Sequence, residues 1–123
     1  MNNIIGLKQS LTDLPAREPI TGLLARKLVG KHVMIQYVTV KKGVSAPQHQ
    51  HPNEQMMVLL EGRMRVLVGD VTKGELTELE LKPGEVIHYP PNMLHGGEAL
   101  EDSVILDIFS PPSETTGIDN SSG

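Results

Sequence analysis

The sequence predicts a single all-β domain, folded as a sandwich or barrel of short strands. Short segments rich in β-branched residues recur at regular spacing, and turn residues bound each of them. Twelve glycines and nine prolines among 123 residues provide for many turns. No segment combines the length, apolar periodicity and capping residues of an amphipathic helix. A chain of this length forms one core, and therefore one domain.

The expected strands can be placed in order along the chain. An apolar candidate covers residues 20–29, and the run 33–40, rich in β-branched residues, is the clearest strand. Further strands are expected at residues 55–60, 64–68, 76–81, 85–89 and 104–109. Gly62 lies in a tight reversal between two of them. We expect the domain to cover residues 1–112, because residues 113–123 are small and polar and predict a loosely held tail.

Composition and charge exclude several kinds of partner. The net charge of −4 and the pI of about 5.7 do not fit the basic surface that nucleic-acid binding requires. The longest apolar run, residues 56–60, is far too short to span a bilayer, and residues 1–6 lack the pattern of a signal peptide. There is no cysteine, which excludes disulfides and thiolate sites. We therefore expect a cytoplasmic protein that binds neither nucleic acid nor a membrane.

The strongest functional signal is a pair of histidines one residue apart. In a β-strand, side chains at i and i+2 point to the same face, so His49 and His51 can aim at one point. On a helix the same spacing would make them diverge. A third histidine, His95, follows another turn-rich segment. Three imidazoles and one oxygen ligand suit a divalent transition metal, whereas the alternative is two solvated surface histidines.

Around these residues the chain resembles the cupin superfamily, and in particular its small single-domain members. The first cupin motif matches Gly43, His49, His51, Gln55 and Gly62. The second motif matches Gly84, Pro90, Pro91, Asn92 and His95. Asn92 replaces a glycine, which is tolerable because asparagine enters the left-handed region readily, and the family's later asparagine is missing at Ala99. The resemblance covers residues 43 to about 99 and implies a double-stranded β-helix, or jelly-roll barrel, with a metal inside it.

The resemblance also implies a set of metal ligands. They are His49, His51, Gln55 and His95, and the cofactor is one divalent ion, with zinc, nickel, iron, manganese and cobalt as candidates. Gln55 stands where glutamate is usual, so the ion keeps its full charge and becomes a stronger Lewis acid. Some sugar-acid cupins resemble this chain in using glutamine there. The alternative is that Gln55 only forms hydrogen bonds and that the ion has three protein ligands.

Asp107 is the candidate catalytic residue. It shares one face of the last expected strand with Phe109 and has apolar neighbours, so burying it is costly unless it has a partner or a role. The segment resembles the closing strand of cupins that convert unsaturated uronates, where an aspartate and a following arginine are linked to catalysis. Ser113 takes the place of that arginine here. The candidates to replace it are Arg17, Arg26, Arg63 and Arg65. The alternative for Asp107 is a strand end that faces solvent.

Three classes of function remain open. The favoured one is a metal-dependent enzyme of isomerase or lyase type that acts on a small polar substrate, such as a sugar acid, keto sugar or keto acid, by Lewis-acid and proton-transfer chemistry. The second is a metal-dependent dioxygenase, and the third is a non-catalytic module that binds a small molecule. Small cupins resembling this chain often pair through their sheets. We therefore expect a homodimer, with residues 20–29 as a candidate contact segment.

Overall fold

The structure, a computed structural model, describes residues 7–70 and 73–112. The tail expected at residues 113–123 lies outside the described residues. One 3-10 helix, η1 (Leu11–Asp13), precedes the strands, and no helix in the described ranges is long and apolar enough to cross a membrane. The strands are β1 (Ala16–Ile20), β2 (Leu23–Val29), β3 (Met34–Val40), β4 (Ser45–His49), β5 (Glu54–Glu61), β6 (Met64–Asp70), β7 (Glu75–Leu81), β8 (Val86–Tyr89), β9 (Leu94–Ala99) and β10 (Ser103–Ser110).

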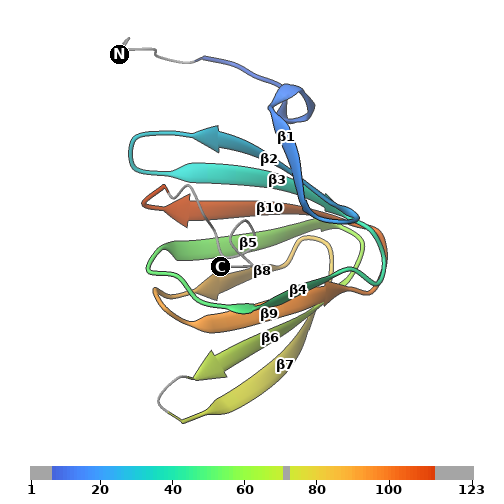
Figure 1. Ribbon diagram of the computed structural model, residues 1–123, viewed down its shortest axis with the longest axis vertical. Helices are drawn as coiled ribbons and strands as arrows, with labels where there is room; N and C mark the ends of the chain where they lie inside the picture. The colour runs from blue at the N-terminus through green and yellow to red at the C-terminus, as the bar shows by residue number, and fades with distance from the viewer. Residues whose placement is uncertain (1–6, 71–72, 113–123) are drawn as a thin grey trace.

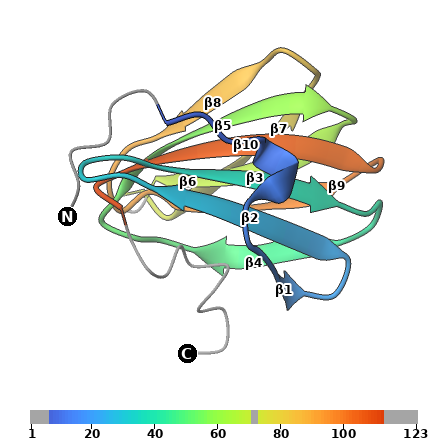
Figure 2. The same cartoon turned by 90° about the horizontal axis from the view of Figure 1, so that it is seen from above.

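The strands form two antiparallel sheets, which confirms the predicted all-β jelly-roll fold. The larger sheet has the order β1-β2-β3-β10-β5-β8, and the smaller has the order β4-β9-β6-β7. Figure 1 shows the last strand, β10, between β3 and β5, and the view from above (Figure 2) again shows β2, β3 and β10 side by side. The C-terminal strand is therefore central to the larger sheet.

Most of the expected strands are present, and the N-terminal one differs from the expectation. The strands predicted from residue 33 onward appear as β3, β5, β6, β7, β8 and β10, with ends that shift by at most two residues. The segment 20–29 is not one strand, because the chain reverses at Gly22, whose φ of 88° favours glycine, and forms a hairpin of β1 with β2. Gly62 also has a positive φ, and a side chain there would collide with the backbone carbonyl of Asp102.

The core lies between the two sheets and follows the two-residue period of the strands. On β10, Ile105, Asp107 and Phe109 are buried, whereas Leu106 and Ile108 lie on the opposite face and are half-buried. The same alternation on β5 places Gln55, Met57 and Leu59 on the inner face, as the sequence predicts. Polar side chains therefore occupy some of the core positions, and these side chains belong to the candidate site.

Candidate metal centre

Three histidine side chains converge inside the barrel. His49 is the last residue of β4, His51 follows two residues later, and His95 on β9 pairs with His49. One ring nitrogen of each lies within 4.8 Å of the others, and the ring centroids are 4.3 to 5.8 Å apart. His51 and His95 are buried and His49 is half-buried. This group can hold a metal ion.

The expected strand geometry is wrong for His51, because β4 ends at His49. A turn from the second motif fixes the chain beyond the strand instead. The backbone N–H of Asn92 donates to the carbonyl oxygen of His51 at 2.7 Å. Asn92 has a φ of 65°, so it adopts the left-handed conformation that explains a glycine at this place in the family motif. The two motifs are thus joined by a backbone hydrogen bond.

Each imidazole is oriented by a backbone carbonyl two residues away. The Nδ1-to-oxygen distances are 2.7 Å from His49 to Pro47, 3.0 Å from His51 to Asn53 and 2.8 Å from His95 to Met93. A carbonyl oxygen only accepts, so each Nδ1 carries the hydrogen and each Nε2 of a neutral ring presents a lone pair. Nε2 of His95 is buried and has no hydrogen-bond partner within the described ranges. These residues fit a metal ion, because ligating histidines usually donate their other N–H in this way.

Gln55 connects the histidine group to a buried carboxyl group. Its Nε2 donates to Oδ1 of Asp107 at 2.9 Å, and its Oε1 lies 3.0 Å from Nε2 of His51. Gln55 and Asp107 are 4% and 3% exposed. When Nε2 of His51 carries no hydrogen, both facing atoms are acceptors, and a cation close to both would remove their repulsion. The amide therefore adds a fourth acceptor atom to the three imidazoles.

Burial also determines which groups in the site carry charge. Desolvation lowers the pKa of His95 to about 4 and lowers the pKa of His49, which keeps both rings neutral near pH 7. Desolvation raises the pKa of Asp107 to about 7, although the hydrogen bond from Gln55 opposes it. Burial, followed by the charge of Asp107, raises the pKa of Tyr89. Neutral imidazoles thus lie in the same site as a carboxyl group that can exchange a proton near neutral pH.

The site lines one end of a cavity of about 50 Å³ between the sheets. The polar lining consists of His49, Gln55, Tyr89, His95 and Asp107. Apart from Gly96 and Gly97, the rest of the lining is apolar, namely Leu23, Val38, Val40, Val44, Ala46, Met57, Met64, Val66 and Ile105. No lysine or arginine of the described residues lines the cavity. Asp107 therefore faces the cavity rather than solvent.

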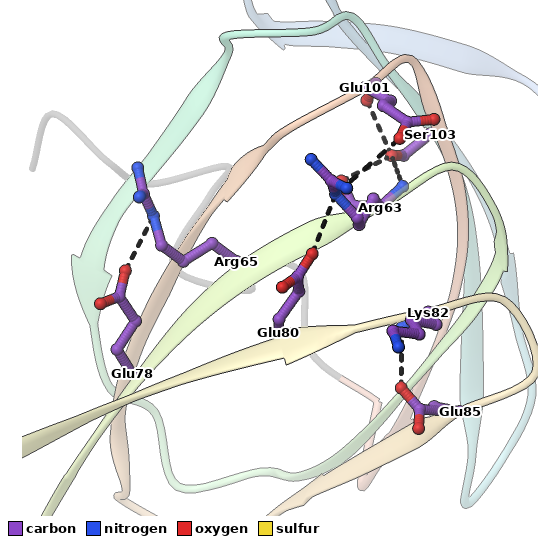
Figure 3. A network of polar contacts seen from close by, with 8 residues as sticks. All are labelled: Arg63, Arg65, Glu78, Glu80, Lys82, Glu85, Glu101 and Ser103. Atoms are coloured by element: carbon purple, nitrogen blue, oxygen red, sulfur yellow. Dashed lines mark hydrogen bonds and ion pairs between the residues drawn. The ribbon is translucent and has the colours of Figure 1, made fainter.

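The four arginines considered as replacements for the family's catalytic arginine, whose place Ser113 takes, do not line this cavity. Arg63 pairs with Glu80 at 2.9 Å and Arg65 pairs with Glu78 at 3.1 Å (Figure 3). Arg65 also pairs with Glu98. Arg65 alternates with the buried Val66, so it projects from the outer face of the smaller sheet. Arg26 donates to the carbonyl oxygen of Leu14 at 2.8 Å, and Arg17 is exposed on β1. These side chains provide no cation at the site.

Two residues of the site were not predicted from the sequence. The ring of Tyr89 stacks on His95 with centroids 4.1 Å apart and an interplanar angle of 14°. Gln36 is fully buried on β3, pairs in register with Asp107, and has no hydrogen-bond partner for either amide atom within the described ranges. The signal for Gln36 is its alternation with Met34 and Val38, which puts an amide at an inward position of an apolar strand.

Comparison with known proteins identifies the family. A model of the cupin domain matches residues 36–109, more than half of the chain. The chain belongs to the cupins. No curated protein sequence matches it significantly.

Solved structures support the same assignment. KdgF from Halomonas sp. superposes with a TM-score of 0.77 at 25% identity, over 89% of this chain and 97% of that protein. An RmlC-like cupin from Shewanella frigidimarina superposes with a TM-score of 0.74 at 23% identity, over 86% and 91%. Oxalate decarboxylase from Lactobacillus farciminis, solved as a formate complex, superposes with a TM-score of 0.81 at 19% identity, over 94% of this chain but 36% of that protein. The last two likenesses concern the fold alone.

Proposed function

We propose that this cupin is a divalent-metal-dependent enzyme that acts on a small polar substrate. The proposed ligands are His49, His51, Gln55 and His95, and Asp107 is the proposed proton-transfer residue. Zinc, nickel, iron, manganese and cobalt are the candidate ions, because imidazole suits all of them. Sugar acids, keto sugars and keto acids are the candidate substrates, because each presents neighbouring oxygen atoms to the site.

The observation that supports the proposal most strongly is the convergence of acceptor atoms in a buried place. The backbone carbonyls bind the Nδ1 hydrogens, and Asp107 binds the amide hydrogen of Gln55. What remains facing inward is a set of lone pairs, and that of His95 has no partner within the described ranges. Buried acceptors without donors are unfavourable, and a cation is the partner that satisfies several of them at once.

The chain's own residues account for the other parts of the reaction. A divalent ion at these ligands supplies Lewis-acid polarisation of a substrate oxygen. The hydrogen bond from Gln55 holds the Asp107 carboxyl beside the place where substrate oxygens bind. A carboxyl group in that position can take a proton from one substrate atom and return it to another. Most of the cavity lining is apolar, and a surrounding of low polarity strengthens these electrostatic interactions.

Protein purified without chelators tests the proposal. We expect near-stoichiometric metal, and turnover of at least one compound from a panel of sugar acids, keto sugars and keto acids. A chelator should abolish the turnover and added metal should restore it. Turnover that consumes dioxygen would favour a dioxygenase instead. A compound that raises the free energy of unfolding, by about 2.7 kcal/mol at a hundred times its Kd, yet is never converted would favour a non-catalytic binding module.

We also propose that two copies of the chain pair through the outer face of the larger sheet. The centre of that face is apolar and carries Ile35, Met56, Val58, Leu106 and Ile108. These five residues lie on the three adjacent strands β3, β10 and β5 and form one continuous patch. The outer face of the smaller sheet carries Arg–Glu pairs across its strands (Figure 3), whereas the His88–Glu54 pair of the larger sheet lies toward its β8 edge. A two-fold axis opposes each face with itself, so the face with the apolar centre is the one that is self-complementary.

The mass in solution tests this pairing. Wild-type protein is expected to have twice the 13.4 kDa of one chain. Leu106→Arg places a charge at the centre of the proposed contact and should yield a folded monomer. Leu67→Arg, on the outer face of the smaller sheet, is the matched control and should leave the mass unchanged. A monomeric wild-type protein, or a Leu106→Arg variant that stays dimeric, contradicts the proposal.

A further inference from the structure

The cavity below the histidines has two chemically different ends. On the larger sheet, successive inward residues of β10 change from Asp107 to Ile105, and β3 continues the apolar part with Val38 and Val40. Phe109, the next inward residue in the other direction, pairs with Gln55. The cavity therefore becomes apolar along the strands with distance from the histidines.

The smaller sheet shows the same change. His95 pairs with Val68 on β6, and the next inward residues of β6, Val66 and Met64, line the cavity further from the histidines. On β4, His49 lies at the polar end, and Ala46 pairs with Gly97 deeper in the cavity. Both sheets thus place hydrogen-bonding groups at one end and apolar side chains at the other.

We propose that the ligand of this site is a short-chain 2-oxo acid, with its oxygen atoms at the histidine end and a tail of one or two carbons among the apolar residues. The inference rests on the proposed function and narrows it to one substrate class. It assigns Val38, Val66 and Ile105 as the residues that select the tail.

The size and chemistry of the cavity favour this class over sugar acids. A volume of about 50 Å³ has room for roughly three to five water-sized groups, which is much nearer to the six or seven heavy atoms of pyruvate or 2-oxobutyrate than to the thirteen of a six-carbon sugar acid such as glucuronate. The hydroxyl groups of a sugar would meet apolar side chains there and lose their hydrogen bonds to water. Because no lysine or arginine of the described residues lines the cavity, a second anionic group on the ligand would have no cationic side chain to bind.

A homologous series of ligands tests the inference by binding alone, without any assay of turnover. Glyoxylate, pyruvate, 2-oxobutyrate, 2-oxovalerate and glucuronate are titrated into the metal-loaded protein by calorimetry. Each buried methylene contributes about 0.8 kcal/mol, so we expect about fourfold tighter binding per carbon up to 2-oxobutyrate and no gain beyond it. Glucuronate should bind at least tenfold more weakly than 2-oxobutyrate. The four 2-oxo acids share the same oxygen pair, and the same series titrated against the ion in solution corrects for chelation alone.

A pair of variants assigns the effect to the cavity. Val66→Ala lengthens the apolar end and should move the optimum from 2-oxobutyrate to 2-oxovalerate. Val104→Ala, on the outward face of β10, is the matched control and should keep the wild-type optimum. Thermal unfolding confirms that both variants are folded.

The outcomes separate this inference from the proposed function. Metal content is measured on the same samples. If the protein holds the ion but its affinity does not change with chain length, or glucuronate binds as tightly as 2-oxobutyrate, the ligand inference is overturned and the metal centre stands. If the optimum is the same in Val66→Ala and in wild type, the assignment of the tail-selecting residues is overturned. If the protein holds no ion, both proposals are overturned.

Discussion

Replacing His51 with alanine is expected to lower the affinity for the metal ion by more than roughly 100-fold. His51 is buried, and its ring contributes one of the convergent Nε2 atoms and faces the amide oxygen of Gln55. Changes to residues that only orient metal ligands typically cost 10- to 100-fold in affinity, so the loss of a ligand should cost more. Elemental analysis of the purified variant, and titration of the metal-free protein with Zn²⁺, measure the effect.

His88→Ala provides the control for this experiment. His88 is an exposed histidine on β8 that pairs with Glu54 at 2.6 Å and does not belong to the histidine group. Its replacement should leave the metal content as in wild type. An unchanged metal content in His51→Ala, or an equal loss in both variants, would contradict the proposed ligand set.

Replacing Asp107 with asparagine is expected to reduce turnover by roughly 100-fold or more while the metal content stays unchanged. Asparagine keeps the shape of the side chain, and its amide oxygen can still accept the hydrogen bond from Gln55. What it loses is the ability to take up and release a proton. The turnover of whichever compound the wild type converts, with metal content and thermal unfolding measured in parallel, checks this expectation.

Asp13→Asn is the matched control, because Asp13 is an exposed aspartate in η1, outside the cavity. It should keep full activity. Full activity in Asp107→Asn would refute the proton-transfer role. If the wild type binds ligands but converts none of them, no catalytic role remains for Asp107.

The sequence predicts the convergence of the three histidines well because most of the relevant geometry is local. The spacing of the two motifs points to the histidines and to Gln55, and the structure brings these side chains together. The role of Asn92 can be read from the sequence for the same reason, because its left-handed backbone conformation depends only on the turn that contains it. The strand period also predicts which of the residues around Asp107 face inward.

Other features depend on pairings between distant strands, which one sequence does not reveal. The amide of Gln36 has no hydrogen-bond partner among the described residues, and it becomes notable only when β3 is placed in register with β10, more than sixty residues later. The sequence also offers Arg63 and Arg65 as replacements for the family's arginine. In the structure their cross-strand partners Glu80 and Glu78 bind them on the outer face of the smaller sheet. The hairpin of β1 and β2 is missed because an apolar run of this kind does not reveal where the chain reverses.

The carbonyl groups that hold the imidazoles also bear on how the histidine group would take up an ion. Each ring is fixed by an oxygen atom from its own short stretch of backbone, so the orientation of one ring does not depend on the other two. The donor atoms are therefore positioned by the folded barrel itself, and little conformational entropy remains to be lost when an ion arrives. Zinc fingers differ, because their folding depends on the metal. An ion bound to these donors would therefore exchange on an intact scaffold, and the supply of ions and donor chemistry, rather than folding, would decide which metal is held.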